Sequence, residues 1–309
     1  MKKKDIILAV ILVTIWGVNF TVIKLGLDGV PSMLLVTLRY VLTAFPAIFF
    51  VKKPETEWKY IILYGLFVGI GQFACLFYAM EIGMPAGIAS IVLQIQAFIS
   101  PVMAMIFLNE SIKSKQIIGF VIAASGLVII GLENAKSGID AIPFTAIILS
   151  LLAPIFWAAS NIVARIASDK ALSDGKKLDM FSLVVWSALI PPIPMLGISL
   201  MLDTPQTILN VVTNLNGVSI FAIIYLAFGA TLFGYGVWGS LLGRYPMGKI
   251  APLPLAVPVI ALISARIILN EHLSGMQWIG VVVILAGLII TNLNPEVILK
   301  HFKKADNKI

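Results

Sequence analysis

The sequence has little charge, one cysteine and two histidines, and each shortage excludes a class of protein. Charged residues make up 12% of the 309 residues and hydrophobic residues 60%, with a mean hydropathy of +1.02. Because an ordinary globular domain has about twice that charged fraction, the composition predicts an integral membrane protein. The single cysteine, Cys75, lies inside an apolar run, so no disulfide framework is expected.

The residues needed for catalysis or for binding a metal are also missing. The only two histidines, His272 and His301, fall at or beyond the ends of apolar runs, which argues against a metal cluster or a Ser/His pair inside the membrane. No phosphate-binding loop of the GxxxxGK[ST] type occurs, so ATP is not expected to be a direct energy source. The acidic residues Glu81, Glu110 and Glu271 lie at the ends of apolar runs, so no carboxylate proton relay is visible. We expect no enzyme activity, no cofactor and no metal.

What is present is a series of long apolar runs. No Lys or Arg occurs between Lys59 and Lys113, and from Met180 to Gly243 the only charge is Asp203. Each stretch contains more than one run of about 20 apolar residues, the length that a helix needs to cross a bilayer. Ten transmembrane helices are predicted, at residues 6–26, 34–51, 60–80, 86–108, 115–132, 144–167, 180–202, 218–241, 247–269 and 276–293.

The distribution of basic residues predicts how these helices are oriented. If the N-terminus is cytoplasmic, the inner segments hold 18 of the 22 basic residues and the outer loops hold Lys136 alone. By the positive-inside rule, both termini are expected in the cytoplasm of a multi-pass protein in the lipid bilayer. The net charge of +7 therefore reports orientation and does not indicate nucleic-acid binding. The first apolar run continues past Phe20 without a small-residue cleavage pattern, which favours an uncleaved first helix over a signal peptide.

One stretch of the chain occurs twice. Residues 85–130 align without a gap on residues 246–291, a shift of 161 positions, with 15 identities in 46 positions. The identities include the pairs Gly87/Gly248, Asn109/Asn270, Glu110/Glu271, Gln116/Gln277 and Gly126/Gly287. A similarity of this length at one fixed shift indicates an internal repeat.

The repeat divides the chain into two halves of five predicted helices. We predict a first repeat at residues 1–135, a second at 142–295 and a basic cytoplasmic tail at 296–309. Because five is an odd number, the two halves must cross the membrane in opposite senses. The predicted fold is thus all-α, with two inverted five-helix repeats. Such repeats place a substrate site near the membrane midplane between them and work by alternating access.

Several motifs resemble those of the EamA family of drug/metabolite transporters. In the first half these are Trp16-Gly17-Val18-Asn19-Phe20 with Lys24, Phe45-Pro46-Ala47-Ile48-Phe49-Phe50, and Gly83-Met84-Pro85-Ala86-Gly87 leading to Gln94 and Gln96. In the second half Trp186-Ser187-Ala188-Leu189-Ile190-Pro191, Gly234-Tyr235-Gly236 with Trp238, Gly243-Arg244-Tyr245 and Ala251-Pro252-Leu253 resemble the O-acetylserine and cysteine exporter branch. The likeness covers nearly the whole chain.

This resemblance implies a ten-helix secondary transporter of the bacterial inner membrane that exports small amino-acid metabolites such as cysteine and O-acetylserine. Two alternatives stay open: an exporter of other amino acids or drugs of the same superfamily, and a membrane receptor or scaffold that does not transport. Paired polar residues near the midplane favour transport, because a scaffold does not need them. The expected partners are a small amino-acid substrate and lipid, and the sequence leaves the oligomeric state open.

Two basic side chains within the predicted helices are candidates to bind a substrate carboxylate. Lys24 and Arg39 both fall in the outer half of their helices. A charge at membrane depth is costly unless it is paired or faces water. The structural alternatives are that Lys24 reaches the lipid headgroups, and that Arg39 pairs with Asp28 or with carbonyls at a helix end.

The uncharged candidates are amides and aromatic residues. Asn19, Gln72, Gln94 and Asn161 can each donate and accept hydrogen bonds, as a zwitterion requires, although amides also join helices to one another in membranes. On a continuous helix, Gln94 and Gln96 would point about 200° apart. Trp16 and Asn19 correspond to Trp157 and Asn161 in the second half. The aromatic candidates for the binding site are Trp16, Tyr78, Trp157 and Trp238, with membrane-interface belts as the alternative role.

Overall fold

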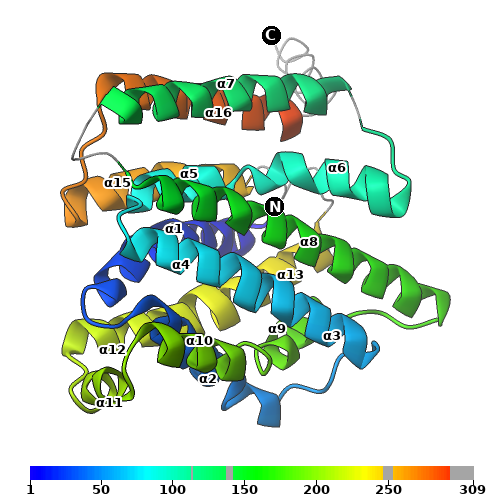
Figure 1. Ribbon diagram of the computed structural model, residues 1–309. Helices are drawn as coiled ribbons and strands as arrows, with labels where there is room; N and C mark the ends of the chain where they lie inside the picture. The colour runs from blue at the N-terminus through cyan, green and yellow to red at the C-terminus, as the bar shows by residue number, and fades with distance from the viewer. Residues whose placement is uncertain (113, 137–141, 246–252, 293–309) are drawn as a thin grey trace.

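The computed structural model describes residues 1–112, 114–136, 142–245 and 253–292, and every regular element among them is a helix. Figure 1 shows the helices lying side by side in several layers, with most of them running across the view. The predicted tail at 296–309 and the first six residues of the predicted helix at 247–269 lie outside the described residues. The chain is an all-helical membrane protein, as its composition predicts.

The first half contains these elements: α1 (Lys3–Leu27), α2 (Ser32–Ala44), the 3-10 turn η1 (Ala47–Phe49), α3 (Trp58–Tyr64), the π-helix η2 (Gly65–Gln72), α4 (Phe73–Glu81), α5 (Ala86–Leu93), α6 (Gln96–Leu108) and α7 (Ser114–Lys136). The second half contains α8 (Phe144–Ser173), α9 (Met180–Ser187), α10 (Pro192–Leu202), α11 (Pro205–Thr213), α12 (Gly217–Ile224), the π-helix η4 (Tyr225–Phe233), α13 (Gly234–Arg244), the 3-10 turn η5 (Leu253–Ala256), α15 (Val257–Ile268) and α16 (Gly275–Asn292).

Within the described residues, seven helical segments are long and apolar enough to span a membrane, and an eighth is obtained if α9 and α10, bent by 40°, form one span. The helices α15 and α16 are apolar but shorter. The count of ten therefore stays a prediction, although the described residues of each predicted span form one helix or a series of consecutive helical segments.

The structure corrects three local expectations. The connection at 203–217, expected to be a loop, contains α11, which begins where the Thr204 hydroxyl accepts a hydrogen bond from the Thr207 amide. The span predicted at 86–108 is broken at Gln94 and Ile95, and the span at 180–202 is broken before Pro192. A proline supplies no amide hydrogen, which favours a break at the second site.

The contact between α7 and α16 displays the repeat directly, and Figure 1 shows the two helices as a pair at one edge. A Cβ added to Gly119 would lie 2.6 Å from the Gly287 carbonyl oxygen, and one added to Gly126 would lie 2.6 Å from the Gly280 carbonyl oxygen. At the shift of 161, Gly119 corresponds to Gly280 and Gly126 to Gly287. Each glycine thus contacts the counterpart of the other, as a two-fold axis between antiparallel helices requires.

Three further features recur at this shift or within one residue of it. The π-helices η2 and η4 begin at Gly65 and Tyr225, in corresponding spans of the two halves. Asn109 and Asn270 both adopt left-handed backbone conformations, with φ of 55° and 54°, just after α6 and α15. The helices α6 and α15 themselves begin at counterpart positions, each directly after an irregular segment. The two-repeat fold is therefore visible in the backbone as well as in the sequence.

Candidate functional site

Arg39 is the one charged residue of the predicted set that the structure buries fully, with 2% of its surface exposed. Its Nε and Nη2 donate to the Thr231 hydroxyl over 3.3 and 2.9 Å. Its guanidinium carbon lies 4.0 Å from the centre of the Phe73 ring, which is the geometry of a cation–π contact. Arg39 is therefore held by a hydroxyl and an aromatic face.

Both partners of Arg39 are positioned by the π-helices. Phe73 follows η2 directly, and Thr231 lies within η4. The wider turn of a π-helix lets the Thr231 hydroxyl donate to the Leu226 carbonyl, five residues back, over 2.8 Å. Because that bond uses the hydroxyl proton, the oxygen lone pairs face Arg39. The repeat thus supplies an irregular turn on each side of the buried cation.

Three buried polar atoms near the middle of their helices have no hydrogen-bond partner among the described residues: Arg39 Nη1, Gln72 Oε1 and Asn19 Oδ1. An unpaired buried polar atom costs free energy, so native proteins rarely retain one without a reason. An arginine Nη donates to carboxylates, and an amide oxygen accepts from ammonium groups. These atoms offer the donors and acceptors that an amino-acid zwitterion uses.

The structural alternative proposed for Arg39 is wrong. Asp28 is exposed at the end of α1, and no ion pair to Arg39 occurs in the described part of the chain. Its hydrogen-bond acceptor is a hydroxyl within a helix, not a carbonyl at a helix end. Within the described residues, the guanidinium is therefore not neutralised by a carboxylate.

Lys24 does meet a helix end. Its Nζ donates to the Met80 carbonyl over 2.7 Å, in the last turn of α4. Beside it, the Glu81 carboxylate accepts from the Ser32 amide and hydroxyl at the start of α2. The ammonium thus caps exposed carbonyls, a favourable position for a cation. A role for Lys24 in substrate binding stays a prediction.

Trp16 on α1 lies beside two aromatic residues of α13, Tyr235 and Trp238. The Trp16 ring centre is 5.8 Å from that of Tyr235 and 5.8 Å from that of Trp238. The Trp16 indole Nε1 donates to the Ala230 carbonyl in η4 over 3.0 Å. A Cβ on Gly234 would lie 2.4 Å from that nitrogen, so only glycine admits the indole there. This cluster adjoins the same π-helix that holds Arg39.

Gln94 and Gln96 lie on either side of the helix break, and their side chains contact different helical segments. The Gln94 Nε2 donates to the Pro254 carbonyl in η5 over 3.0 Å, which joins the broken span of one repeat to that of the other. Gln96 accepts from the Asn161 Nδ2 at 3.3 Å and from the Ser100 hydroxyl at 3.2 Å. Discontinuous helices at corresponding positions of two repeats are a mark of transporter binding sites.

Two predicted residues, Tyr78 and Trp157, are half-buried against the main apolar core. In the described part of the chain no aromatic pair or side-chain hydrogen bond joins them to the other predicted residues.

Sequence reasoning missed Phe73 and Thr231, which hold Arg39. These two residues carry no signal of their own, because phenylalanine and threonine are common in apolar helices. The available signal was the repeat, which relates the segments that contain them.

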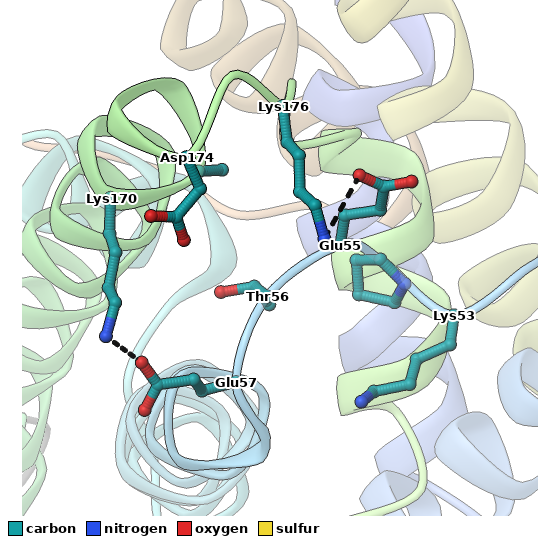
Figure 2. Close-up of a pocket in the computed structure, with 9 residues that line it drawn as sticks. Lys53, Glu55, Thr56, Glu57, Lys170, Asp174 and Lys176 are labelled. Atoms are coloured by element: carbon teal, nitrogen blue, oxygen red, sulfur yellow. Dashed lines mark hydrogen bonds and ion pairs between the residues drawn. The ribbon is translucent and has the colours of Figure 1, made fainter.

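A separate pocket of about 290 Å³ lies at the predicted cytoplasmic edge, between the 53–57 connection and the end of α8 (Figure 2). Ion pairs join Lys170 to Glu57 and Lys176 to Glu55, the latter at 3.9 Å. The ammonium of Lys170 holds the pKa of the Glu57 carboxyl below its ordinary value. Exposed pairs of this kind contribute little stability. None of the predicted site residues lines this pocket, so we assign it a structural role.

Comparisons with known proteins agree with this architecture. The model of the EamA-like transporter family matches residues 3–132 and 144–293. A protein of Escherichia coli (strain K12) described as a probable amino-acid metabolite efflux pump is 42% identical over 290 residues, which cover 94% of this chain and 95% of that protein. A probable terminal-alkyne amino-acid exporter of Streptantibioticus cattleyicolor is 23% identical over 94% of this chain and 95% of its own. One solved crystal structure, 13% identical, matches with a TM-score of 0.61 over 94% of this chain and 96% of its own, and supports the fold alone.

Proposed function

The chain belongs to the EamA-like transporter family, and on that basis we propose that it is a secondary exporter of amino-acid metabolites whose substrates are cysteine and O-acetylserine. The relative that is described as an amino-acid metabolite efflux pump, 42% identical, supports this class of substrate. Movement of one repeat against the other would open the site to each side in turn.

The observation that carries the proposal is the buried Arg39. A guanidinium at membrane depth without a carboxylate partner is costly, by about 2.5–3.5 kcal/mol on insertion scales. Its free Nη1 and the neutral Thr231 hydroxyl leave the charge uncompensated, and a substrate carboxylate would compensate it. An arginine can offer two parallel N–H donors to one carboxylate.

Other contacts are proposed from the same part of the structure. Asn19 and Gln72 offer their unpaired oxygens to the substrate ammonium. Trp16, three residues before Asn19 on α1, supplies an apolar surface. The remaining proposed contacts are the other polar and aromatic residues of the predicted set: Lys24, Tyr78, Gln94, Trp157, Asn161 and Trp238.

The topology is proposed in full from the sequence. The repeats occupy residues 1–135 and 142–295, the basic tail is 296–309, and ten spans place both termini in the cytoplasm of a bacterium. The family model matches the chain in two segments, 3–132 and 144–293, which supports this division.

Uptake into inside-out membrane vesicles tests the proposal, because such uptake corresponds to export from the cell. Labelled O-acetylserine and labelled cysteine should enter vesicles that contain the protein and not matched vesicles that lack it. Uptake restricted to other amino acids or drugs would replace the substrate class and keep the transporter. If no amino acid or drug entered, the receptor or scaffold alternative would be favoured.

The alternative of another amino-acid substrate has one observation of its own. The relative described as a terminal-alkyne amino-acid exporter matches 94% of this chain, so one fold is associated with more than one amino-acid side chain. Competition of unlabelled amino acids against labelled O-acetylserine ranks these substrates directly.

A further inference from the structure

A strip of polar side chains lies where α6 faces α8, on the predicted cytoplasmic half of the molecule. These helices pack against each other, and Figure 1 shows them as neighbours. The residues of this polar strip are Gln96, Ser100, Glu110, Asn161, Arg165 and Asp169. Every one of them is at least partly exposed, although several lie well within the lengths of their helices. Because polar groups in membrane helices face protein or water and not lipid, the polar strip indicates a water-accessible path.

The predicted cytoplasmic end of the polar strip carries one positive charge, on Arg165, and two negative charges, on Glu110 and Asp169. Arg165 Nη2 lies 3.6 Å from the Glu110 carboxylate, and the two side chains are 58% and 52% exposed. Arg165 also contacts Asp169 on its own helix over 3.1 Å. An exposed pair of this kind is held weakly, so another charged group can displace either partner.

The repeat gives this pair a counterpart. A shift of 141 positions carries Trp16, Lys24 and Asp28 onto Trp157, Arg165 and Asp169, and the shift of 161 carries Glu110 onto Glu271. The counterparts of Arg165 and Glu110 are therefore Lys24 and Glu271. In the predicted topology these two residues lie on the opposite side of the membrane.

In the structure, the two pairs are in different states. Lys24 donates to the Met80 carbonyl over 2.7 Å, and the Glu271 carboxylate accepts from the Ala86 and Gly87 amides over 2.7 and 3.0 Å. At that end, both charged side chains are hydrogen-bonded to the backbone at helix termini. Arg165 and Glu110 have each other and Asp169 and remain exposed.

The helix contacts beside the two pairs differ in the same sense. On the side of Lys24, α1 packs tightly on α15, because a Cβ on Gly17 would lie 2.5 Å from Ile260 and the Thr21 and Ser264 hydroxyls are 2.8 Å apart in a buried contact. On the side of Arg165, the contact between α6 and α8 includes the exposed hydrogen bond from Asn161 to Gln96. The helix contact beside Lys24 is thus buried, whereas the one beside Arg165 includes exposed polar side chains.

We propose that Arg165 and Glu110 form an entry site that recognises the amino-acid zwitterion at the predicted cytoplasmic end. The substrate carboxylate replaces Glu110 on Arg165, and the released Glu110 carboxylate takes the substrate ammonium. Gln96 and Asn161 then receive the substrate further along the polar strip. The entry site rests on the proposed function, since it deepens the account of which substrates are admitted.

Protection of an introduced cysteine from labelling tests the entry site. In a Cys75→Ser background the chain has no other cysteine. Ser100→Cys lies on the polar strip, and the matched control Ala261→Cys lies at its repeat counterpart, which is fully buried. In inside-out vesicles, a charged membrane-impermeant thiol reagent should label position 100 and not position 261.

O-acetylserine, which has no thiol, should slow labelling at position 100. Two analogues that each lack one charge, O-acetylethanolamine without the carboxylate and N,O-diacetylserine without the ammonium, should protect at least tenfold less well. Adding Arg165→Gln or Glu110→Gln should raise the half-protecting concentration of O-acetylserine at least tenfold. Lys170→Gln, which removes an exposed charge on the same helix away from the polar strip, should leave it unchanged.

The outcomes separate the two proposals. Failure to label position 100 would mean that the polar strip is not reached by water, and the entry site would be wrong. Equal protection by the zwitterion and both analogues, or full protection in Arg165→Gln, would also overturn it, while uptake measured in parallel would leave the export function standing. If wild-type vesicles took up no O-acetylserine and the ester gave no protection, both proposals would fall.

Discussion

At the residue scale, no carboxylate of the described part of the chain pairs with the buried charge of Arg39. The Thr231 hydroxyl and the Phe73 ring position the guanidinium but do not neutralise it. This arrangement leaves one N–H edge of the side chain for an anion. Two single-residue changes distinguish binding of the substrate from support of the fold.

Arg39→Lys should retain membrane insertion and lose most transport. A lysine ammonium keeps the charge but cannot contact Thr231 and also present a two-donor edge to a carboxylate. Loss of one charged hydrogen bond, about 1.5–3 kcal/mol, corresponds to roughly a 10- to 100-fold lower rate of O-acetylserine uptake. The matched change Arg266→Lys, at an exposed arginine of α15, should leave uptake unchanged. Wild-type uptake by a well-expressed Arg39→Lys variant would remove Arg39 from the binding site.

Thr231→Val and Thr231→Ser test how Arg39 is positioned. Valine has nearly the same shape as threonine but no hydroxyl, so the guanidinium loses its only hydrogen-bond acceptor among the described residues. We expect uptake by Thr231→Val to fall about tenfold, in line with the loss of a hydrogen bond to a charged group. Serine keeps the hydroxyl and should retain most activity. Uptake by Thr231→Val equal to that of Thr231→Ser would show that the hydroxyl does not position Arg39 for transport.

At the element scale, the irregular segments of the two halves correspond. The π-helices η2 and η4 hold or adjoin the partners of Arg39, and the helix breaks before α6 and α15 are joined by the Gln94 side chain. The regular pair α7 and α16 lies apart from them and joins the repeats through glycines. We infer that the irregular spans serve transport and that the regular pair serves stability.

Gly126→Ala should destabilise the protein without changing its substrate selectivity. Its Cβ would lie 2.6 Å from the Gly280 carbonyl oxygen, too close for any real contact, so α7 and α16 must separate. Overpacking of this kind costs about 1–3 kcal/mol. Gly131→Ala, on the same helix, is the matched control, because no described atom lies within 4 Å of its added Cβ. Thermal unfolding in detergent should show a lower midpoint for Gly126→Ala alone.

At the scale of the whole molecule, the two ends of the pathway differ although the repeats that form them are related. Glu271 and Lys24 join helix termini at one end, whereas Arg165 and Glu110 are exposed at the other. The sequence predicts which end faces the cytoplasm, because 18 of the 22 basic residues fall in the segments expected on that side.

Reporter fusions test that orientation. Alkaline phosphatase joined after the C-terminus should be inactive in cells, and a fluorescent protein at the same place should fold and emit. Phosphatase inserted in the connection before α11 should be active, because this connection is predicted to lie outside. The opposite pattern would invert the molecule and exchange the proposed entry and exit ends.

The sequence by itself determined the membrane-protein class and the repeat. An apolar run of about 20 residues crosses the membrane as a helix. The bilayer supplies no hydrogen-bond partners, and a helix pairs its own backbone amides and carbonyls. The shift of 161 relates Asn109 to Asn270 in sequence and, in the structure, in backbone conformation. These are local or periodic properties, which a sequence states directly.

Only the tertiary structure decided which polar residues meet. Arg39 contacts Thr231, which is 192 positions away in the sequence, and Gln96 contacts Asn161, which is 65 positions away. No pattern along the chain specifies either pairing. The partner expected for Arg39, Asp28, lies nearer in sequence but stays exposed, because helix packing and the wide turn of η4 place a hydroxyl beside the guanidinium instead. The contact between two side chains on different helices depends on the rotation and bend of both helices, and those are set by packing over the whole molecule.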